Sequence, residues 1–131
     1  MSQPNPLTTV HCVMFPLFVL SASDGDLAEE EMKDIFMTAN TLPDIFNDVT
    51  KENAQNAAKE CAEWYDSISA KEALNVACWC CGEIHKDLNE TNRENIVRFY
   101  DDQIKADGKV TEVELSLHKV FSMIIRKGLD A

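Results

Sequence analysis

The chain is organised around one acidic stretch, SASDGDLAEEEM (residues 21–32). A weaker copy stands near the other end of the chain, IKADGKVTEVEL (residues 104–115). Superposing Asp24 on Asp107 aligns the two Asp-Gly steps and places Glu31 on Glu114, with an aliphatic residue two positions after each glycine. An internal repeat of this kind predicts a duplicated helix pair, with one copy near each end of the chain.

Apolar residues recur at helical spacing along the chain, and the alternating pattern typical of strands is absent. We therefore expect an extended lead-in over residues 1–6 and one all-α domain over residues 7–131. This domain is a bundle of six to seven helices that contains the duplicated pair. The expected helices cover residues 7–22, 28–41, 50–68, 69–88, 91–105 and 111–128, with a short turn or helix at residues 45–46.

Three capping boxes, in which Ser or Thr is followed three residues later by Glu, mark expected helix starts. They begin at Ser69, Thr91 and Thr111. The helix after Ser69 is expected to turn one stripe of side chains inward: Leu74, Cys78, Cys81, His85 and Leu88. The core is also expected to hold the aromatic side chains of Trp64, Tyr65 and Trp79.

The charge of the chain limits its partners. With 23 acidic and 12 basic residues, its formal net charge is −11. Such a chain repels phosphate backbones and anionic lipid surfaces, so we expect no nucleic-acid partner. The apolar run at residues 12–20 is too short to span a bilayer, so we expect no membrane insertion and interpret this run as a core helix.

Five cysteines are present, and three of them crowd into residues 78–81. An odd number with this spacing is not typical of a secreted disulfide framework. Reduced thiols indicate a reducing compartment, and we expect the protein to be cytoplasmic.

The repeated motif suggests a cation site. Asp24 is expected in the turn between two helices, and Glu31 in the first turn of the second helix, so both carboxylates face one corner. Hard oxygen ligands favour a divalent cation such as Ca²⁺, Mg²⁺ or Mn²⁺. Compared with an EF-hand loop, each copy lacks half of the ligands. If the two copies pack together, Asp24, Glu31, Asp107 and Glu114 share one metal site, which needs a cation to offset their repulsion.

These two Asp-Gly-x5-Glu motifs resemble the TerB-like domain of tellurite-resistance proteins, which is also related to domains at the N-terminus of DjlA-type membrane co-chaperones. The resemblance covers residues 7–40 and 91–127. It implies an all-α fold with a duplicated helical arrangement, a stress-response context and an acidic site proposed to bind divalent metal. The carry-over places that site on Asp24, Glu31, Asp107 and Glu114.

A purely structural interpretation of the same residues is also open. Asp-Gly steps are ordinary turn sequences, and Glu in the first helical turn is an ordinary capping residue. Cys78, Cys81 and His85 share a helix face and could begin a zinc site, but a fourth ligand is missing and core packing explains them better. A Cys–His pair without an orienting third group does not indicate catalysis, so we expect no enzyme.

Two functions remain open. The first is a TerB-like, stress-associated module that binds a divalent cation through the two motifs. The alternative is a metal-independent protein–protein interaction domain that presents an acidic surface to a basic partner protein. The sequence does not identify that partner.

Overall fold

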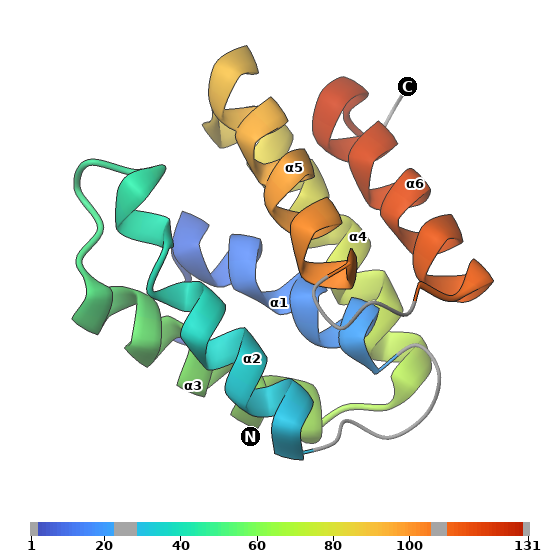
Figure 1. Cartoon of the computed structure of the whole chain (residues 1–131), viewed down its shortest axis with the longest axis horizontal. Helices are drawn as coiled ribbons and strands as arrows, with labels where there is room; N and C mark the ends of the chain where they lie inside the picture. Colours follow the sequence, from blue (N-terminus) through green and yellow to red (C-terminus); the bar gives the residue numbers. More distant parts are fainter. Residues whose placement is uncertain (1–2, 23–28, 106–109, 130–131) are drawn as a thin grey trace.

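The computed structural model describes residues 3–22, 29–105 and 110–129, and in these residues the chain is all-α, as predicted (Figure 1). Six α-helices and one 3₁₀ helix are present within the described ranges, without strands. The elements are α1 (Thr9–Ser21), α2 (Glu29–Ala39), η1 (Leu42–Asp44), α3 (Lys51–Asp66), α4 (Ala70–Asp87), α5 (Glu90–Lys105) and α6 (Glu112–Lys127).

Helix α1 forms the centre of the fold. Every residue from His11 to Leu20 is buried. A helix that is apolar on all sides is stable only when other elements surround it. The other helices do this: α1 contacts α2, α3, α4, α5 and α6, and in Figure 1 it lies between α2 and α3 on one side and α4 to α6 on the other. The apolar run at residues 12–20 is therefore a core helix, as predicted.

Two kinds of contact fix the neighbouring helices to α1. On the α5 side, the hydroxyl of the fully buried Tyr100 donates a hydrogen bond to the Val13 carbonyl oxygen at 2.6 Å. On the α3 side, the rings of Phe15 and Trp64 are 4.6 Å apart between centroids. The predictions that Trp64 and Tyr65 pack in the core are confirmed, because Trp64 is buried and Tyr65 packs against the core cluster.

Two of the predicted capping positions are confirmed and one is wrong. Ser69 and Thr111 begin α4 and α6, and their hydroxyls accept hydrogen bonds from the backbone N–H groups of Glu72 and Glu114. Helix α5 begins two residues earlier than Thr91 would require. The Asn89 side-chain oxygen accepts a hydrogen bond from the Asn92 N–H at 2.8 Å, so Asn89 takes the N-cap position instead.

The predicted inward stripe of α4 is right in part: Cys81 is buried and Cys78 and Leu88 pack against the core, but Leu74 is exposed. The buried residues are Ala73, Ala77, Cys80, Cys81, Gly82 and Ile84. Leu74 and Trp79 are exposed, whereas Cys78, His85 and Leu88 are half-buried. Helix α4 packs against both α1 and α6, and its buried side chains are mostly small. At Gly82 a Cβ would meet Leu129 Cδ1, just beyond the end of α6, at 2.7 Å. The sequence prediction placed the large side chains of Leu74 and Trp79 in the core, whereas mostly small side chains line the buried side of α4.

No helix within the described residues is long and apolar enough to cross a membrane.

Candidate functional site

The predicted cation site is only partly within the described structure. Asp24 and Asp107 lie outside the described residues. Glu31 is half-buried in the first turn of α2, and Glu114 is half-buried in the first turn of α6. These two turns lie at different edges of the molecule in Figure 1. Across residues 3–22, 29–105 and 110–129, no three His, Cys, Asp or Glu side chains are grouped to hold a metal ion.

Glu114 has a structural role of its own. Its Oε1 accepts a hydrogen bond from the Thr111 N–H at 3.1 Å, while its own N–H donates to Thr111 Oγ1 at 3.1 Å. These two hydrogen bonds satisfy the backbone N–H groups of Thr111 and Glu114 at the start of α6. The capping interpretation of Glu114 is thereby confirmed, and the shared site for all four carboxylates remains a prediction.

Replacing Glu31 and Glu114 by Gln separates cation binding, which needs the carboxylate charge, from the capping of α6 by residue 114, which needs only a hydrogen-bond acceptor. In the double variant Glu31→Gln, Glu114→Gln, the Gln side chain at position 114 still accepts the Thr111 N–H but carries no charge. The cation hypothesis predicts saturable heat on calorimetric titration of the wild type with Ca²⁺, Mg²⁺ or Mn²⁺, and its loss in this variant. A wild type that shows neither heat nor a shift in Tm at millimolar cation would refute the hypothesis.

The fold gathers four buried cysteines from three helices: Cys12 on α1, Cys61 on α3, and Cys80 and Cys81 on α4. Hydrogen bonding to Cys12 and burial raise the pKa of the Cys80 thiol, and burial raises the pKa of Cys61 and Cys81. A thiol with a raised pKa is protonated at neutral pH and is a poor nucleophile or metal ligand. These cysteines therefore serve as small apolar core residues, in agreement with the core interpretation of Cys81.

Cysteine alkylation tests this assignment. Cys78 is half-buried, whereas Cys61, Cys80 and Cys81 are fully buried. At pH 8 we expect N-ethylmaleimide to modify Cys78 at least about tenfold faster than these three, because their access and thiolate fractions are lower. Mass spectrometry of tryptic peptides measures the rates. Modification of Cys80 or Cys81 as fast as Cys78 would contradict the core assignment.

Each of the three histidine rings makes a hydrogen bond with a backbone group. His85 Nδ1 donates to the Ile125 carbonyl oxygen at 3.0 Å, and His118 Nε2 donates to that of Val97 at 3.1 Å, joining α6 to α4 and α5 respectively. His11 Nδ1 accepts the Thr8 N–H at 3.0 Å, which places the proton on Nε2, 3.4 Å from a Glu60 carboxylate oxygen. His85 is thus an interhelical contact, in keeping with a structural rather than a zinc-binding role.

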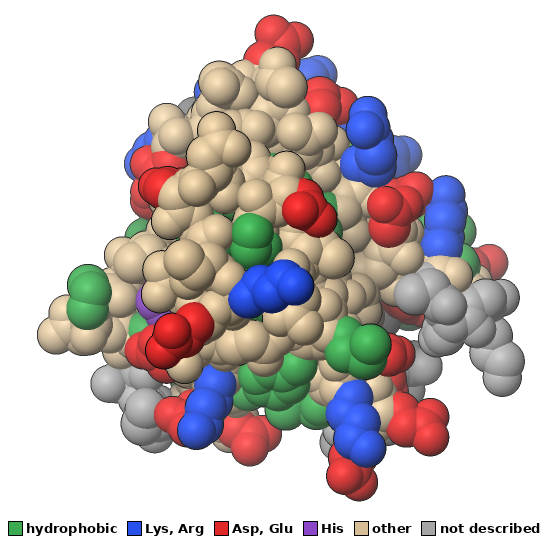
Figure 2. Space-filling view, turned by 60° about the vertical axis from the view of Figure 1, so that its left-hand side comes forward, with side chains coloured by type: hydrophobic (Ala, Val, Ile, Leu, Met, Phe, Trp, Pro, Cys, Tyr) green, Lys and Arg blue, Asp and Glu red, His purple; other side chains and the backbone are tan. Residues whose placement is uncertain are grey.

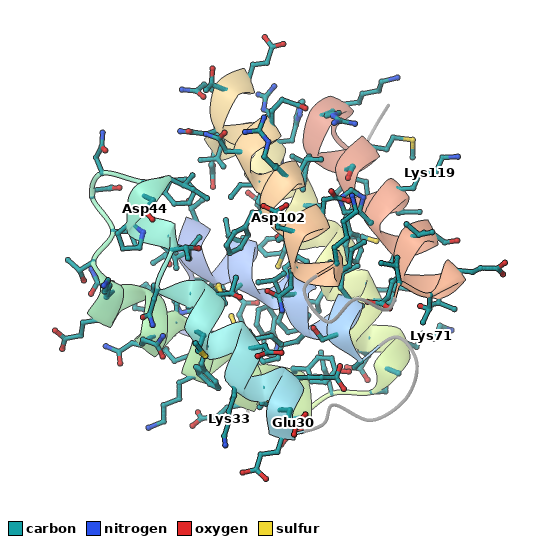
Figure 3. All side chains as sticks on the ribbon, viewed as in Figure 1. Glu30, Lys33, Asp44, Lys71, Asp102 and Lys119 are labelled. Atoms are coloured by element: carbon teal, nitrogen blue, oxygen red, sulfur yellow. The ribbon has the colours of Figure 1, made fainter. Side chains whose placement is uncertain are left out.

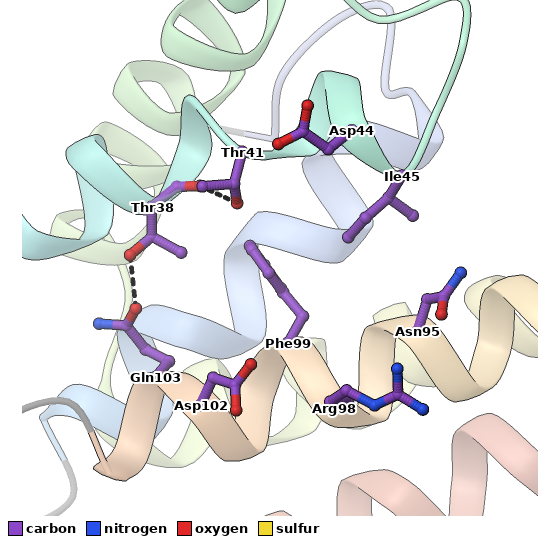
Figure 4. A pocket seen from close by; sticks show the side chains of 9 residues that line it. All are labelled: Thr38, Thr41, Asp44, Ile45, Asn95, Arg98, Phe99, Asp102 and Gln103. Atoms are coloured by element: carbon purple, nitrogen blue, oxygen red, sulfur yellow. Dashed lines mark hydrogen bonds between the residues drawn. The ribbon is translucent and has the colours of Figure 1, made fainter.

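A cleft of about 480 Å³ lies between the α2–η1 segment and α5 (Figure 4). Phe99 and Ile45 supply its apolar surface, and charged groups of both signs, Asp44, Arg98 and Asp102, surround it. The Thr38 hydroxyl donates to Gln103 Oε1 at 2.6 Å and so bridges the two walls. Asp44, Arg98 and Asp102 are exposed to solvent, so the charged groups around the cleft are hydrated.

A different surface stands out in its composition: the outer face of α6, which we define by Val113, Leu115, Lys119, Val120, Met123, Arg126 and Lys127. Its four apolar side chains are between 40% and 53% exposed. The surface shown in Figure 2 instead intersperses acidic and basic side chains with small apolar areas. Clustered exposed apolar side chains are uncommon on monomeric proteins and mark interaction surfaces.

Beyond its first turn, which carries Glu112 and Glu114, the outer face of α6 is also basic, although the whole chain has a net charge of −11. From Leu115 to Lys127 there is no acidic residue. Arg126 is paired with Glu94 through two hydrogen bonds of 2.8 and 2.9 Å. Lys119 and Lys127 have no carboxylate within 4.0 Å among the described residues, and Figure 3 shows Lys119 pointing away from the bundle.

Comparisons with known proteins find no matching family model, no similar curated protein and no similar solved structure. The TerB-like resemblance therefore remains a prediction based on the two motifs, and the geometry of the chain itself has to support a function.

A spacing pattern in the sequence indicates the outer face of α6, although the prediction of core residues did not use it. Residues 113, 116, 120, 123 and 127 alternate in spacing between three and four, which is the pattern of a coiled-coil seam. The inward-facing side chains of Phe121 and Ile125 are fully buried, and they already attach this helix to the core. The second apolar stripe is therefore available for another purpose.

Proposed function

We propose that this protein is a helical protein–protein interaction module that binds its partner through the outer face of α6. The observation that carries this proposal is the exposed seam Val113, Val120 and Met123 on a helix whose opposite side already completes the core. Val113 lies within the second Asp-Gly motif, whereas Val120 and Met123 lie beyond both motifs. The proposed contacts are made by apolar side chains, so we expect binding without a cation. This proposal keeps the interaction function expected from the sequence but places it on an apolar and basic surface.

The folded structure gives these apolar side chains no packing role. Helix α6 contacts α4, α5 and α1 through Phe121, Ile124 and Ile125, which are buried. Full burial of a Val or Met side chain is worth about 1.5–3 kcal/mol, and because these side chains are already about half covered, binding gains roughly half of that for each. Three such side chains in one row supply a substantial part of the free energy of a helix-sized interface.

Site-specific photocrosslinking tests the location of the interface. A benzophenone amino acid replaces Val120 on α6 or, as the matched control, Met37 on α2, which is 69% exposed. In cells that naturally produce the protein, we expect discrete crosslinked adducts from position 120 and not from position 37. The adducts should persist in the presence of a divalent-cation chelator.

A second experiment places the crosslinker at position 113, where it should also give adducts. The variant Val120→Glu, Met123→Glu should abolish these adducts, because two carboxylates cannot enter an apolar interface unpaired. Met37→Glu should leave them unchanged. Equal crosslinking at positions 120 and 37, or adducts that survive the double substitution, would contradict an interface on α6.

A further inference from the structure

The outer face of α6 also indicates the chemistry of its partner; this inference rests on the function proposed above. We infer that the face binds a single amphipathic helix whose apolar stripe is flanked by Asp or Glu.

The spacing selects a helix as the occupant. Val113, Ser116, Val120, Met123 and Lys127 follow one line along α6, with two intervals of three residues and two of four. In two-stranded coiled coils, side chains at this spacing insert between those of a facing helix. Ser116 is the small position in the row, and it allows a large side chain of the partner to approach α6 closely.

The charges select acidic flanks. Lys119 lies beside the row, and Lys127 ends it. Both are exposed, and neither is paired within the part of the chain that the structure describes. Flanking charges of opposite sign set partner choice in helix pairs, and like charges in those positions are unfavourable. A partner with basic flanks would place its lysines against Lys119 and Lys127.

Two other occupants fit less well. A second copy of this chain would place the same lysines of both α6 helices in one interface, where like charges are unfavourable. An anionic membrane is disfavoured because the seam lacks the aromatic side chains that anchor proteins at lipid headgroups. An acidic helix satisfies both the apolar row and the lysines.

Two labelled peptides test the inference on the full chain. Both are amphipathic helices with leucine at the seam positions, and they differ only in carrying Glu or Lys beside the seam. Fluorescence anisotropy at low salt, about 50 mM NaCl, should give a Kd at least tenfold lower for the Glu peptide, and the difference should shrink at about 300 mM NaCl. Backbone NMR shifts should change along the outer face of α6.

Charge reversal supplies the control. Lys119→Glu, Lys127→Glu should remove or invert the preference for the Glu peptide. Lys51→Glu, Lys59→Glu on α3 makes the same change in net charge at exposed positions elsewhere and should preserve it.

The possible failures are distinguishable. Equal binding of both peptides at α6 would overturn the acidic partner while leaving the interaction module in place. If neither peptide shifts α6 resonances, both proposals fail. Concentration-dependent dimerisation through α6 in sedimentation, or binding to phosphatidylserine vesicles that the Lys119→Glu, Lys127→Glu variant loses, would replace the acidic helix with a second copy or a membrane.

Discussion

The structure depends on the burial of α1 from all sides. Residues 11–20 expose almost no surface, and each large apolar side chain among them gains about 1.5–3 kcal/mol from burial. A helix of this kind cannot lie at a surface, so the remaining helices must form around it. The hydrogen bond from Tyr100 to the Val13 carbonyl oxygen sets the position of α5 against it. This bond satisfies a phenol that is buried together with α1.

Because α1 provides the centre, the outer helices need only one apolar side each. In α5 the other side is polar, as expected for a surface helix. Helix α6 departs from this rule, because it is apolar on its inner side and again along its outer seam. This departure, together with Lys119 and Lys127, which have no carboxylate partner among the residues that the structure describes, is why we place the functional surface on α6.

Local patterns were sufficient to predict the all-α class, the core position of residues 12–20 and the caps at Ser69 and Thr111. They failed where neighbouring residues compete. Asn89 and Thr91 are both good N-caps, and in the structure the Asn89 side chain makes the capping hydrogen bond. On α4 the close approach of α1 and α6 favoured Ala73, Ala77 and Cys80 over Leu74 and Trp79. The cysteine cluster and the cleft join residues distant in sequence, so no local signal indicated them.

The free energy of unfolding in denaturant tests most directly the claim that the core centres on α1 and leaves the seam of α6 free. Val120→Ser, Met123→Ser should stay within about 0.5 kcal/mol of wild type, as exposed substitutions usually do. Phe18→Ala, at a fully buried position of α1, should lose about 3–5 kcal/mol. A loss in the α6 variant comparable to that of Phe18→Ala would show that the seam belongs to the folded core and contradict its role as a binding surface.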